Sequence, residues 1–343
     1  MHLLELVWRG RGPAWRLART ALWPLEGIYR AVVASRAALY ATGIASSTKS
    51  RIPVLSVGNL TVGGTGKTPV SSWLAARLAS AGAVPAIVLR GYGGDEPLVH
   101  AAINPGLPVV IASNRVEGIA EAVSLGADVA VLDDAFQHRR AARNADVVLV
   151  SADRWTNDIR LLPAGPWRES LAAIRRATLV IITAKIAGRE DIELASVAIR
   201  SVAPELEQAI VRLTPGKLLS VTEAGASLPP AAVKGRRVLA IAAIADPDAF
   251  FSQLESMGAV VARRPFADHH PFSRADAAEL AAVSRTSDMI VCTLKDAVKL
   301  RSLWPVGASP LWYVSLSVEV ESGMNAIDGV LEGVLAARPF HTA

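Results

Sequence analysis

The sequence predicts an α/β protein built from two α/β/α lobes, and three observations support this fold class. Short apolar runs alternate with helical stretches, as in parallel sheets whose strands are linked by helices. These runs fall into two sets, separated by a less regular stretch over residues 190–236. The chain has 343 residues, which is long for one core and favours two domains. Its 51% hydrophobic and 20% charged residues exclude a disordered chain.

The first set of apolar runs predicts a doubly wound parallel sheet. Its six expected strands cover residues 53–57, 86–89, 109–112, 129–132, 147–151 and 179–183. The second set predicts a smaller sheet with strands at residues 238–244, 260–264, 289–293 and 311–318. Between them, residues 209–213 are a candidate ribbon strand that precedes a Pro-Gly turn signal.

Three domains follow from this pattern. We expect an N-terminal helical arm over residues 1–50, a first domain over residues 51–214, and a smaller α/β domain with the hinge over residues 215–343.

The positive charge is concentrated in the arm. The formal net charge is +5 and the pI is about 9.6. Residues 1–51 hold eight basic and two acidic side chains, a balance of +6, so the remaining residues sum to −1. This distribution favours an anionic membrane surface over a nucleic-acid groove lined by stacking aromatics. We expect no nucleic acid partner, and no obligate protein partner is evident from the sequence.

The arm has the periodicity of an amphipathic helix. Apolar positions recur at spacings of three and four residues, at Trp15, Ala18, Leu22, Leu25, Tyr29 and Val32. Basic residues lie on another side, at Arg9, Arg16, Arg19 and Arg30. Pro24 is expected to break or kink the helix, and Arg36 falls on the apolar side. Two interpretations stay open: a helix on an anionic lipid surface, or an arm packed on the protein's own surface.

No segment of the sequence has the pattern of a cleaved signal peptide or of a transmembrane helix. Cys292 is the only cysteine, which excludes an intrachain disulfide and favours a reducing compartment.

Residues 56–68 (SVGNLTVGGTGKT) have the context of a phosphate-binding loop, because they follow an apolar strand and precede a helical run over residues 70–79. Glycines let backbone N–H groups approach phosphates. Lys67 is expected to reach the β- and γ-phosphates, and the Thr68 hydroxyl is expected to ligate Mg²⁺. Thr61 stands where the usual pattern has its first glycine. The alternative is a glycine-rich strand-to-helix turn without a ligand.

Other polar residues follow the ends of predicted strands, where ligands bind in open α/β sheets. Asp133 and Asp134 end the apolar run 129–132, so one of them is expected to hold Mg²⁺. In residues 90–97, Asp95 is a candidate base and Arg90 a candidate phosphate partner. The alternative for this segment is a solvated turn. His269 and His270 are neighbours that point to opposite sides of an extended segment, which favours one histidine working with a carboxylate over a metal site.

Seven motifs occur in a fixed order over most of the chain. They are SVGNLTVGGTGKTP (56–69), RGYGG (90–94), GDEP (94–97), DDAFQHRR (133–140), LPAGPWRE (162–169), ADH (267–269) and TLKDAVK (293–299). This series resembles that of the tetraacyldisaccharide 4′-kinases, the lipid A 4′-kinases of Gram-negative bacteria. The resemblance implies a phosphate-loop lobe and a second α/β lobe joined by a β-ribbon, with the basic arm on the cytoplasmic face of the inner membrane. RGYGG and GDEP share Gly94, where the family has an insert.

The resemblance also implies an activity: ATP-dependent phosphorylation, with Mg²⁺, of the 4′-hydroxyl of a tetraacylated glucosamine disaccharide 1-phosphate. The implied nucleotide-binding residues are Gly63, Gly64, Thr65, Gly66, Lys67 and Thr68. The implied metal contacts are Thr68, Asp133, Asp134 and Glu96. Lys67 is also implied to be catalytic, as is Asp95, which accepts the sugar proton and is oriented by His269 from the other lobe. The implied substrate contacts are Arg90, Gln137 and His138. A membrane-recruited ATPase or GTPase switch with a protein partner is the alternative function.

Overall fold

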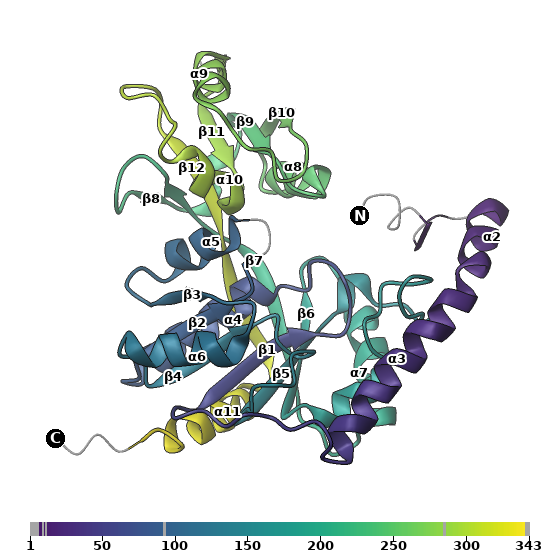
Figure 1. Cartoon of the computed structure of the whole chain (residues 1–343). Helices are drawn as coiled ribbons and strands as arrows, with labels where there is room; N and C mark the ends of the chain where they lie inside the picture. Colours follow the sequence, from purple (N-terminus) through teal and green to yellow (C-terminus); the bar gives the residue numbers. More distant parts are fainter. Residues whose placement is uncertain (1–6, 9, 11, 92–93, 284–285, 340–343) are drawn as a thin grey trace. The chain divides into compact units, whose positions relative to one another are not determined.

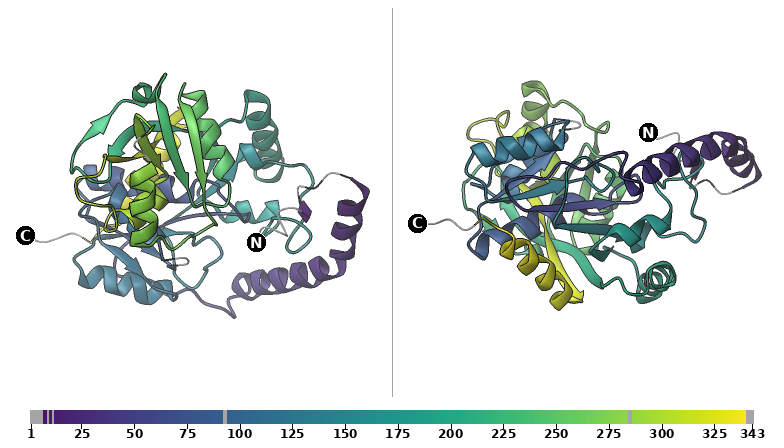
Figure 2. Two further views of the ribbon diagram at one scale, coloured as in Figure 1. Left: turned by 90° about the horizontal axis from the view of Figure 1, so that it is seen from above. Right: turned by 60° about the horizontal axis from the view of Figure 1, so that its bottom comes forward.

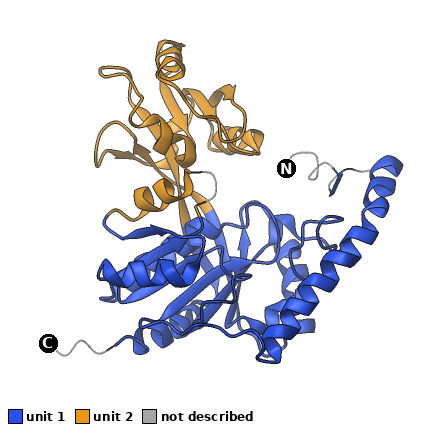
Figure 3. Cartoon of the chain, viewed as in Figure 1, with its two compact units in different colours: residues 1–90, 106–213, 318–343 blue, residues 91–105, 214–317 orange. Residues whose placement is uncertain are grey.

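The computed structural model describes residues 7–8, 10, 12–91, 94–283 and 286–339 (Figure 1). The chain forms two compact units (Figure 3). Unit 1 comprises residues 1–90, 106–213 and 318–343, and unit 2 comprises residues 91–105 and 214–317. This division differs from the expected domains in three segments: the arm is part of unit 1 and not a separate unit, residues 91–105 lie in unit 2, and residues 318–343 lie in unit 1.

Unit 1 contains a parallel sheet with the neighbour order β7-β6-β5-β1-β4-β2-β3. Its strands are β1 (Val54–Asn59), β2 (Pro85–Leu89), β3 (Val109–Ile111), β4 (Val129–Asp133), β5 (Ala145–Ser151), β6 (Leu179–Ala184) and the first part of β7 (Gln208–Ser220). The predicted doubly wound sheet is therefore confirmed. Each of the six expected strands is present, with ends shifted by no more than two residues.

Helices cover both faces of this sheet, and its strands are therefore buried on both sides. The main helices are α4 (Lys67–Ser80), α6 (Arg115–Ser124), α7 (Arg189–Val202) and α11 (Met324–Ala336). On β1, Leu55 and Val57 face the core formed with α4 and α11. Val54 faces the opposite core, to which α6 contributes, and α7 packs over β5 and β6 on that same side. Short 3₁₀ helices η1 (Ala152–Arg154) and η2 (Leu171–Arg176) connect β5 to β6.

The N-terminal arm forms two helices, α2 (Pro13–Ala21) and α3 (Trp23–Ala41), which bend relative to each other (Figure 2). Pro24 lies in the first turn of α3, where its missing N–H costs no hydrogen bond, so the expected break is confirmed. One side of α3 contacts the body of unit 1. The buried Glu26 accepts a hydrogen bond from Leu161 N, Tyr29 Oη donates to the Arg168 carbonyl, and Arg36 Nη2 donates to the Gln137 carbonyl.

An adjacent side of α3 carries an exposed apolar stripe, Leu25, Ile28, Val32 and Leu39. Ile28 is 63% exposed and Val32 61%. The predicted apolar face is therefore only partly correct, because Tyr29, which was expected on it, packs against the body. The basic face is also smaller than expected. Arg19 donates to three carbonyls near the start of α2, Arg30 pairs with Glu26, and Arg9 lies outside the described residues.

Unit 2 has its own parallel strands, in the order β10-β9-β11-β12. They are β9 (Arg237–Ala242), β10 (Val260–Pro265), β11 (Met289–Cys292) and the first part of β12 (Leu311–Ser322). Helices α9 (Arg274–Val283) and α10 (Leu294–Leu300) cover one face, and α8 (Pro247–Ser256) with the 3₁₀ helix η3 (Pro230–Val233) covers the other. Helix α5 (Glu96–Ile103) packs against α10, which explains why its segment groups with unit 2.

Two strands belong to both units. β7 starts in unit 1 and ends in unit 2, whereas β12 starts in unit 2 and ends in unit 1. They are neighbours, and β8 (Ser227–Leu228) pairs with the end of β7. The candidate ribbon strand is therefore longer than the sequence predicted. The return of β12 carries α11 back to unit 1.

Candidate functional site

The phosphate-binding loop connects β1 to α4 in unit 1. Asn59, the last residue of β1, holds the loop in shape by donating from Nδ2 to the Thr61 carbonyl (2.7 Å) and to Thr65 Oγ1 (2.9 Å). Thr183 Oγ1, at the end of β6, donates to the Thr65 carbonyl (2.9 Å). These side chains are buried, so the loop is fixed by its own strand and by a second strand. A loop that is held in one conformation can bind an anionic group without rearranging first.

Two glycines of the loop have conformations that other residues adopt poorly. Gly63 has φ +111° and Gly66 has φ +83°. A Cβ atom at Gly66 would lie 2.5 Å from Leu213 Cδ1. Thr61 does not need to be a glycine, because its φ is not positive. It forms an antiparallel bridge with Trp167. The absence of the usual first glycine is therefore compatible with this loop, whose start is tied to the LPAGPWRE segment.

Asp134 lies at the centre of a charged cluster beside the loop. Its Oδ1 is 2.9 Å from Arg168 Nη1 and 3.7 Å from Lys67 Nζ. Burial would raise the pKa of the Asp134 carboxyl, but the neighbouring Lys67, Arg168 and Arg115 outweigh burial and hold this pKa below its usual value. The carboxylate is therefore ionised at neutral pH.

The donor set beside the loop fits Mg²⁺. Asp133 is buried at the end of β4, and its Oδ1 accepts a hydrogen bond from Asp134 N (3.0 Å). The two carboxylates and the Thr68 hydroxyl are hard oxygen donors, and Mg²⁺ bound to a nucleotide needs only one or two protein carboxylates besides phosphate oxygens. No cluster of three His, Cys, Asp or Glu side chains suited to a metal occurs among the described residues, and such a nucleotide-bound ion does not need one.

The three predicted substrate contacts all lie in unit 1. Gln137 Nε2 donates to the Asn59 carbonyl (2.8 Å), and its Oε1 is 3.4 Å from Arg168 Nη1, so it links the loop to the Asp134 cluster. His138 follows it, and its Nε2 is buried without a hydrogen-bond partner. Arg90 follows β2 and is exposed. Within its RGYGG motif, Tyr92 and Gly93 lie outside the described residues.

His138 is expected to make stability depend on pH. Burial, with the positive charges of Arg115, Arg143 and Arg36, lowers the pKa of His138 to about 4 from an ordinary 6.5. Between these two values the unfolded chain binds a proton that the folded protein does not, so the free energy of unfolding falls as pH falls from 6.5 to 4. Urea unfolding at pH 7 and pH 5 should show a smaller drop for His138→Gln than for the wild type. An equal drop in the free energy of unfolding for the two proteins would show that His138 does not cause the pH dependence.

A second cluster surrounds Asp95, in unit 2. Asp95 is 2% exposed and immediately precedes α5. Its Oδ2 lies 3.3 Å from His269 Nδ1 and 3.6 Å from Lys299 Nζ. The two candidate catalytic groups are therefore brought together as predicted. The expectation that they come from different lobes is wrong, because α5 packs with the second sheet and both residues belong to unit 2.

Asp296 lies at the base of this cluster. Its Oδ2 accepts hydrogen bonds from Ala243 N (3.1 Å) and Thr293 Oγ1 (2.6 Å). Burial raises the pKa of the Asp296 carboxyl, its hydrogen bonds and Lys299 oppose that shift, and Asp95 adds to it. Lys299 thus provides positive charge to two buried aspartates. Asp296 also ties the TLKDAVK segment to the end of β9.

Two other predicted residues have separate surroundings. Glu96, expected to contact the metal, is the first residue of α5 and belongs to unit 2, whereas Thr68, Asp133 and Asp134 belong to unit 1. His270 does not share partners with His269: its Nε2 lies 3.4 Å from Asp276 Oδ2.

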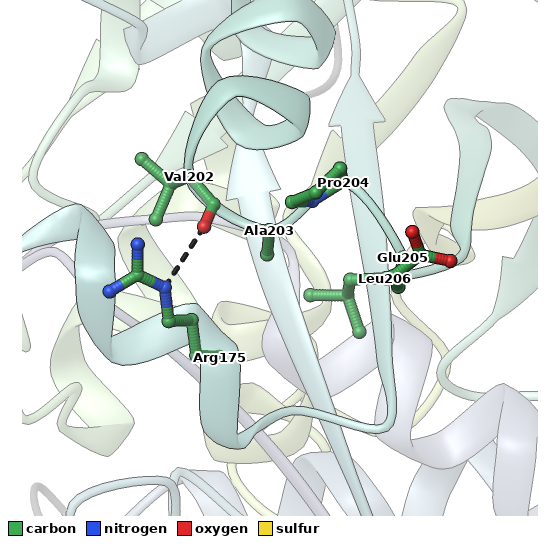
Figure 4. A pocket seen from close by; sticks show the side chains of 6 residues that line it. All are labelled: Arg175, Val202, Ala203, Pro204, Glu205 and Leu206. Carbon is green, nitrogen blue, oxygen red and sulfur yellow. Dashed lines mark hydrogen bonds between the residues drawn. The ribbon is translucent and has the colours of Figure 1, made fainter.

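Two residues that contact the predicted ones, Arg168 and Lys299, were not predicted to have a role. Both residues lie inside motifs on which the family resemblance rests, LPAGPWRE and TLKDAVK. Their place in these motifs was the signal that could have identified them. A cavity of about 360 Å³ lies elsewhere, at the end of α7 (Figure 4). It is lined by Arg175 and by residues 202–206, none of which belongs to either cluster.

Comparisons with known proteins cover nearly the whole chain. A family described as Tetraacyldisaccharide-1-P 4'-kinase matches residues 18–334. A tetraacyldisaccharide 4'-kinase of Anaeromyxobacter sp. (strain K) is 39% identical, over 99% of this chain and 97% of that protein. Another, of Geobacter sulfurreducens, is 36% identical, over 88% and 90%. A crystal structure of LpxK from Aquifex aeolicus in complex with ATP is 26% identical with a TM-score of 0.74, over 92% and 99%. The chain belongs to the tetraacyldisaccharide-1-P 4'-kinase family.

Proposed function

We propose that this chain transfers the γ-phosphoryl group of ATP to the 4′-hydroxyl of a tetraacylated glucosamine disaccharide 1-phosphate. The observation that carries this proposal is the family match over residues 18–334, which includes both the phosphate-binding loop and the Asp95 cluster. The protein is a lipid A pathway kinase that uses ATP and Mg²⁺ and acts on a lipid A disaccharide precursor. The alternative of a nucleotide switch with a protein partner is not favoured.

The reaction makes three demands on the protein. The charge on the transferred phosphoryl group must be neutralised, the reacting groups must be aligned, and the sugar hydroxyl must lose a proton. Mg²⁺, when bound, neutralises phosphate charge, and Thr68, Asp133 and Asp134 are the proposed residues that hold it. Lys67 is the proposed cation for the β- and γ-phosphates. The backbone of Gly63, Gly64, Thr65 and Gly66 is the proposed cradle.

Proton removal is assigned to Asp95. A buried carboxylate beside a histidine is a suitable general base, because the histidine can accept the proton from it. We propose that Arg90, Gln137 and His138 contact substrate or the transferred group, and that Glu96 makes a further acidic contact to the metal or phosphate site. β7 and β12 are the proposed hinge, because both strands continue from one unit into the other.

A direct assay tests the activity. The purified protein with Mg-ATP and the tetraacylated disaccharide 1-phosphate in detergent should yield a product that is one phosphate heavier by mass spectrometry. The matched 4′-deoxy acceptor should yield none. Absence of product at all detergent and protein concentrations would contradict the proposed function, and nucleotide hydrolysis stimulated by a protein but not by the glycolipid would favour the switch.

We further propose that α3 holds the enzyme on the cytoplasmic face of the inner membrane, beside its lipid substrate. The support is the exposed stripe Leu25, Ile28, Val32 and Leu39, which resembles the apolar side of an interfacial helix. No described helix is long and apolar enough to cross a membrane.

Replacing two residues of this stripe tests the membrane proposal. Ile28→Ser with Val32→Ser should lower binding to phosphatidylglycerol-containing vesicles by about tenfold or more, because two apolar side chains lose their transfer energy. Leu194→Ser with Val197→Ser is the matched control, because these residues are exposed on α7. Co-sedimentation measures both. If the α3 variant binds the vesicles as well as the α7 control does, the exposed stripe of α3 does not bind the membrane.

A further inference from the structure

His269, the proposed partner of the catalytic base, has an unusual backbone conformation. Its φ is +58°, in the left-handed region. Of the non-glycine residues that the structure describes, only His269 and Asp134 have a positive φ. A residue with a side chain stays in this region only where the surrounding structure imposes it, because the conformation costs free energy. Neighbouring contacts must therefore hold His269 in place.

The side chain of His269 is half exposed, so packing constrains it weakly. It is 48% exposed, and its Nδ1 lies 3.3 Å from Asp95 Oδ2. Its Nε2 lies 3.9 Å from Oδ1 of Asp268, a second and more exposed carboxylate. Since little else fixes the imidazole, its direction follows from the backbone that carries it. The contact with Asp95 therefore depends on the turn between β10 and α9.

The start of this turn is anchored to β9. Phe266 N donates to the Ala242 carbonyl (2.8 Å), and His269 N donates to the Ala243 carbonyl (3.2 Å). These hydrogen bonds fix the path of the chain up to His269. The left-handed φ of His269 then turns the chain in a new direction, so the segment that follows must be held as well.

His270 holds the following segment with its ring. Its imidazole contacts Phe266 and Phe272, at ring-centroid distances of 4.9 and 5.0 Å, and the two phenyl rings are 5.0 Å from each other. Phe272 is 8% exposed and belongs to the core that α9 covers. The three rings therefore connect the chain before His269 to the chain after it.

A carboxylate ties the same imidazole to α9. His270 Nε2 lies 3.4 Å from Asp276 Oδ2. Asp276 is itself fixed, because Ser273 N and Ser273 Oγ donate to its Oδ2 (both 2.7 Å) and its own N–H donates to Ser273 Oγ (3.1 Å). This reciprocal pair is a capping box at the start of α9. The hydrogen bonds from Ser273 lower the pKa of the Asp276 carboxyl, so it is an ionised acceptor at neutral pH.

We propose that His270 is a positioning residue for phosphoryl transfer: it clamps the turn over residues 266–272 to α9 and so keeps His269 Nδ1 beside Asp95. The inference rests on the proposed function, in which Asp95 takes the sugar proton and His269 is its partner. His270 acts only through His269. Without the clamp, His269 leaves the left-handed conformation and turns toward Asp268, and the base loses its partner.

Kinetics of a double-mutant cycle tests this role. His270→Ala should lower kcat about tenfold or more and change the KM for ATP by less than about twofold, because a small displacement of a catalytic pair costs that much. His270→Phe keeps the ring contacts and should retain most of the kcat that His270→Ala loses. In a His269→Ala background, His270→Ala should lower kcat by about twofold at most, since no imidazole remains to be positioned.

The matched control is Arg274→Ala, because Arg274 is exposed and is the first residue of α9, beside the capping box. It should keep the kcat of the wild type. An equal loss from His270→Ala in both backgrounds is the result of a purely structural role and would overturn the proposal. If His270→Ala does not fold, His270→Leu takes its place, since leucine fills the space without a ring or a nitrogen.

A second measurement needs neither substrate nor activity. NMR detects the imidazole groups of the six histidines, and His269→Gln assigns the signal of His269. Asp95→Asn should shift this signal in the wild type and shift it much less in His270→Ala. Shifts of the same size in both would overturn the clamp. A wild type that yields no phosphorylated glycolipid would contradict the proposed function, whereas the shifts still decide the role of His270.

Discussion

Lys67→Met is expected to lower kcat by about three orders of magnitude, with less effect on the KM for the glycolipid. Lys67 is the first residue of α4, its side chain is 15% exposed, and its Nζ lies beside the phosphate-binding loop near Asp134. The ammonium group neutralises charge that increases in the transition state of phosphoryl transfer, so its loss affects turnover more than binding. Steady-state kinetics with the tetraacylated disaccharide 1-phosphate measures the effect.

The structure indicates that this variant still folds. Asp134, whose side chain is partly exposed, keeps its ion pair with Arg168 when Lys67 is removed, so its carboxylate is not left without a partner. Lys49→Met is the control for loss of one positive charge, because Lys49 is exposed and lies outside the loop. It should retain nearly full activity. A Lys67→Met enzyme within tenfold of the wild type, with the same melting temperature, would exclude Lys67 from the catalytic step.

Local patterns in the sequence were sufficient to predict the strands and the phosphate-binding loop. Short apolar runs bounded by polar turns identify buried parallel strands, because both faces of such strands are covered by helices. The loop is encoded by neighbouring residues, with glycines at the positive-φ positions Gly63 and Gly66 and a lysine at the helix start. Both kinds of signal are complete within about fifteen residues.

Contacts between distant segments could not be predicted in the same way. Arg168 lies 34 residues from its partner Asp134, and Asp95 reaches Lys299 and His269 across most of unit 2. No spacing rule links such pairs, because their approach depends on how helices and loops pack on the sheet. The grouping of α5 with α10 is a tertiary effect of this kind, and it moved Asp95 into unit 2.

The arm shows a related limit. Periodicity predicts that a helix has an apolar side, but it does not say what covers that side. In α3 a mixed stripe that includes Glu26, Tyr29 and Arg36 contacts the body, and the apolar stripe is left exposed. Arg36, which fell on the apolar side by periodicity, is explained by its hydrogen bond to the Gln137 carbonyl.

Asp95→Asn is expected to lower kcat by about two to four orders of magnitude, the usual contribution of a positioned general base. The amide keeps the shape of the side chain but cannot accept the proton of the sugar hydroxyl at neutral pH. The KM for ATP should change little. A phosphoryl-transfer assay with saturating ATP separates the two constants, and Asp268→Asn is the control, since this exposed carboxylate lies 3.9 Å from the same histidine, His269.

Loss of the Asp95 charge also leaves Lys299 with one counter-charge fewer in a buried position, so reduced activity could arise from a weakened fold. The double variant Asp95→Asn with Lys299→Met removes that buried cation, and the structure predicts that it restores thermal stability without restoring turnover. If instead the double variant recovers activity within tenfold of the wild type, Asp95 acts only by balancing the charge of Lys299. In that case a base other than Asp95 must take the proton.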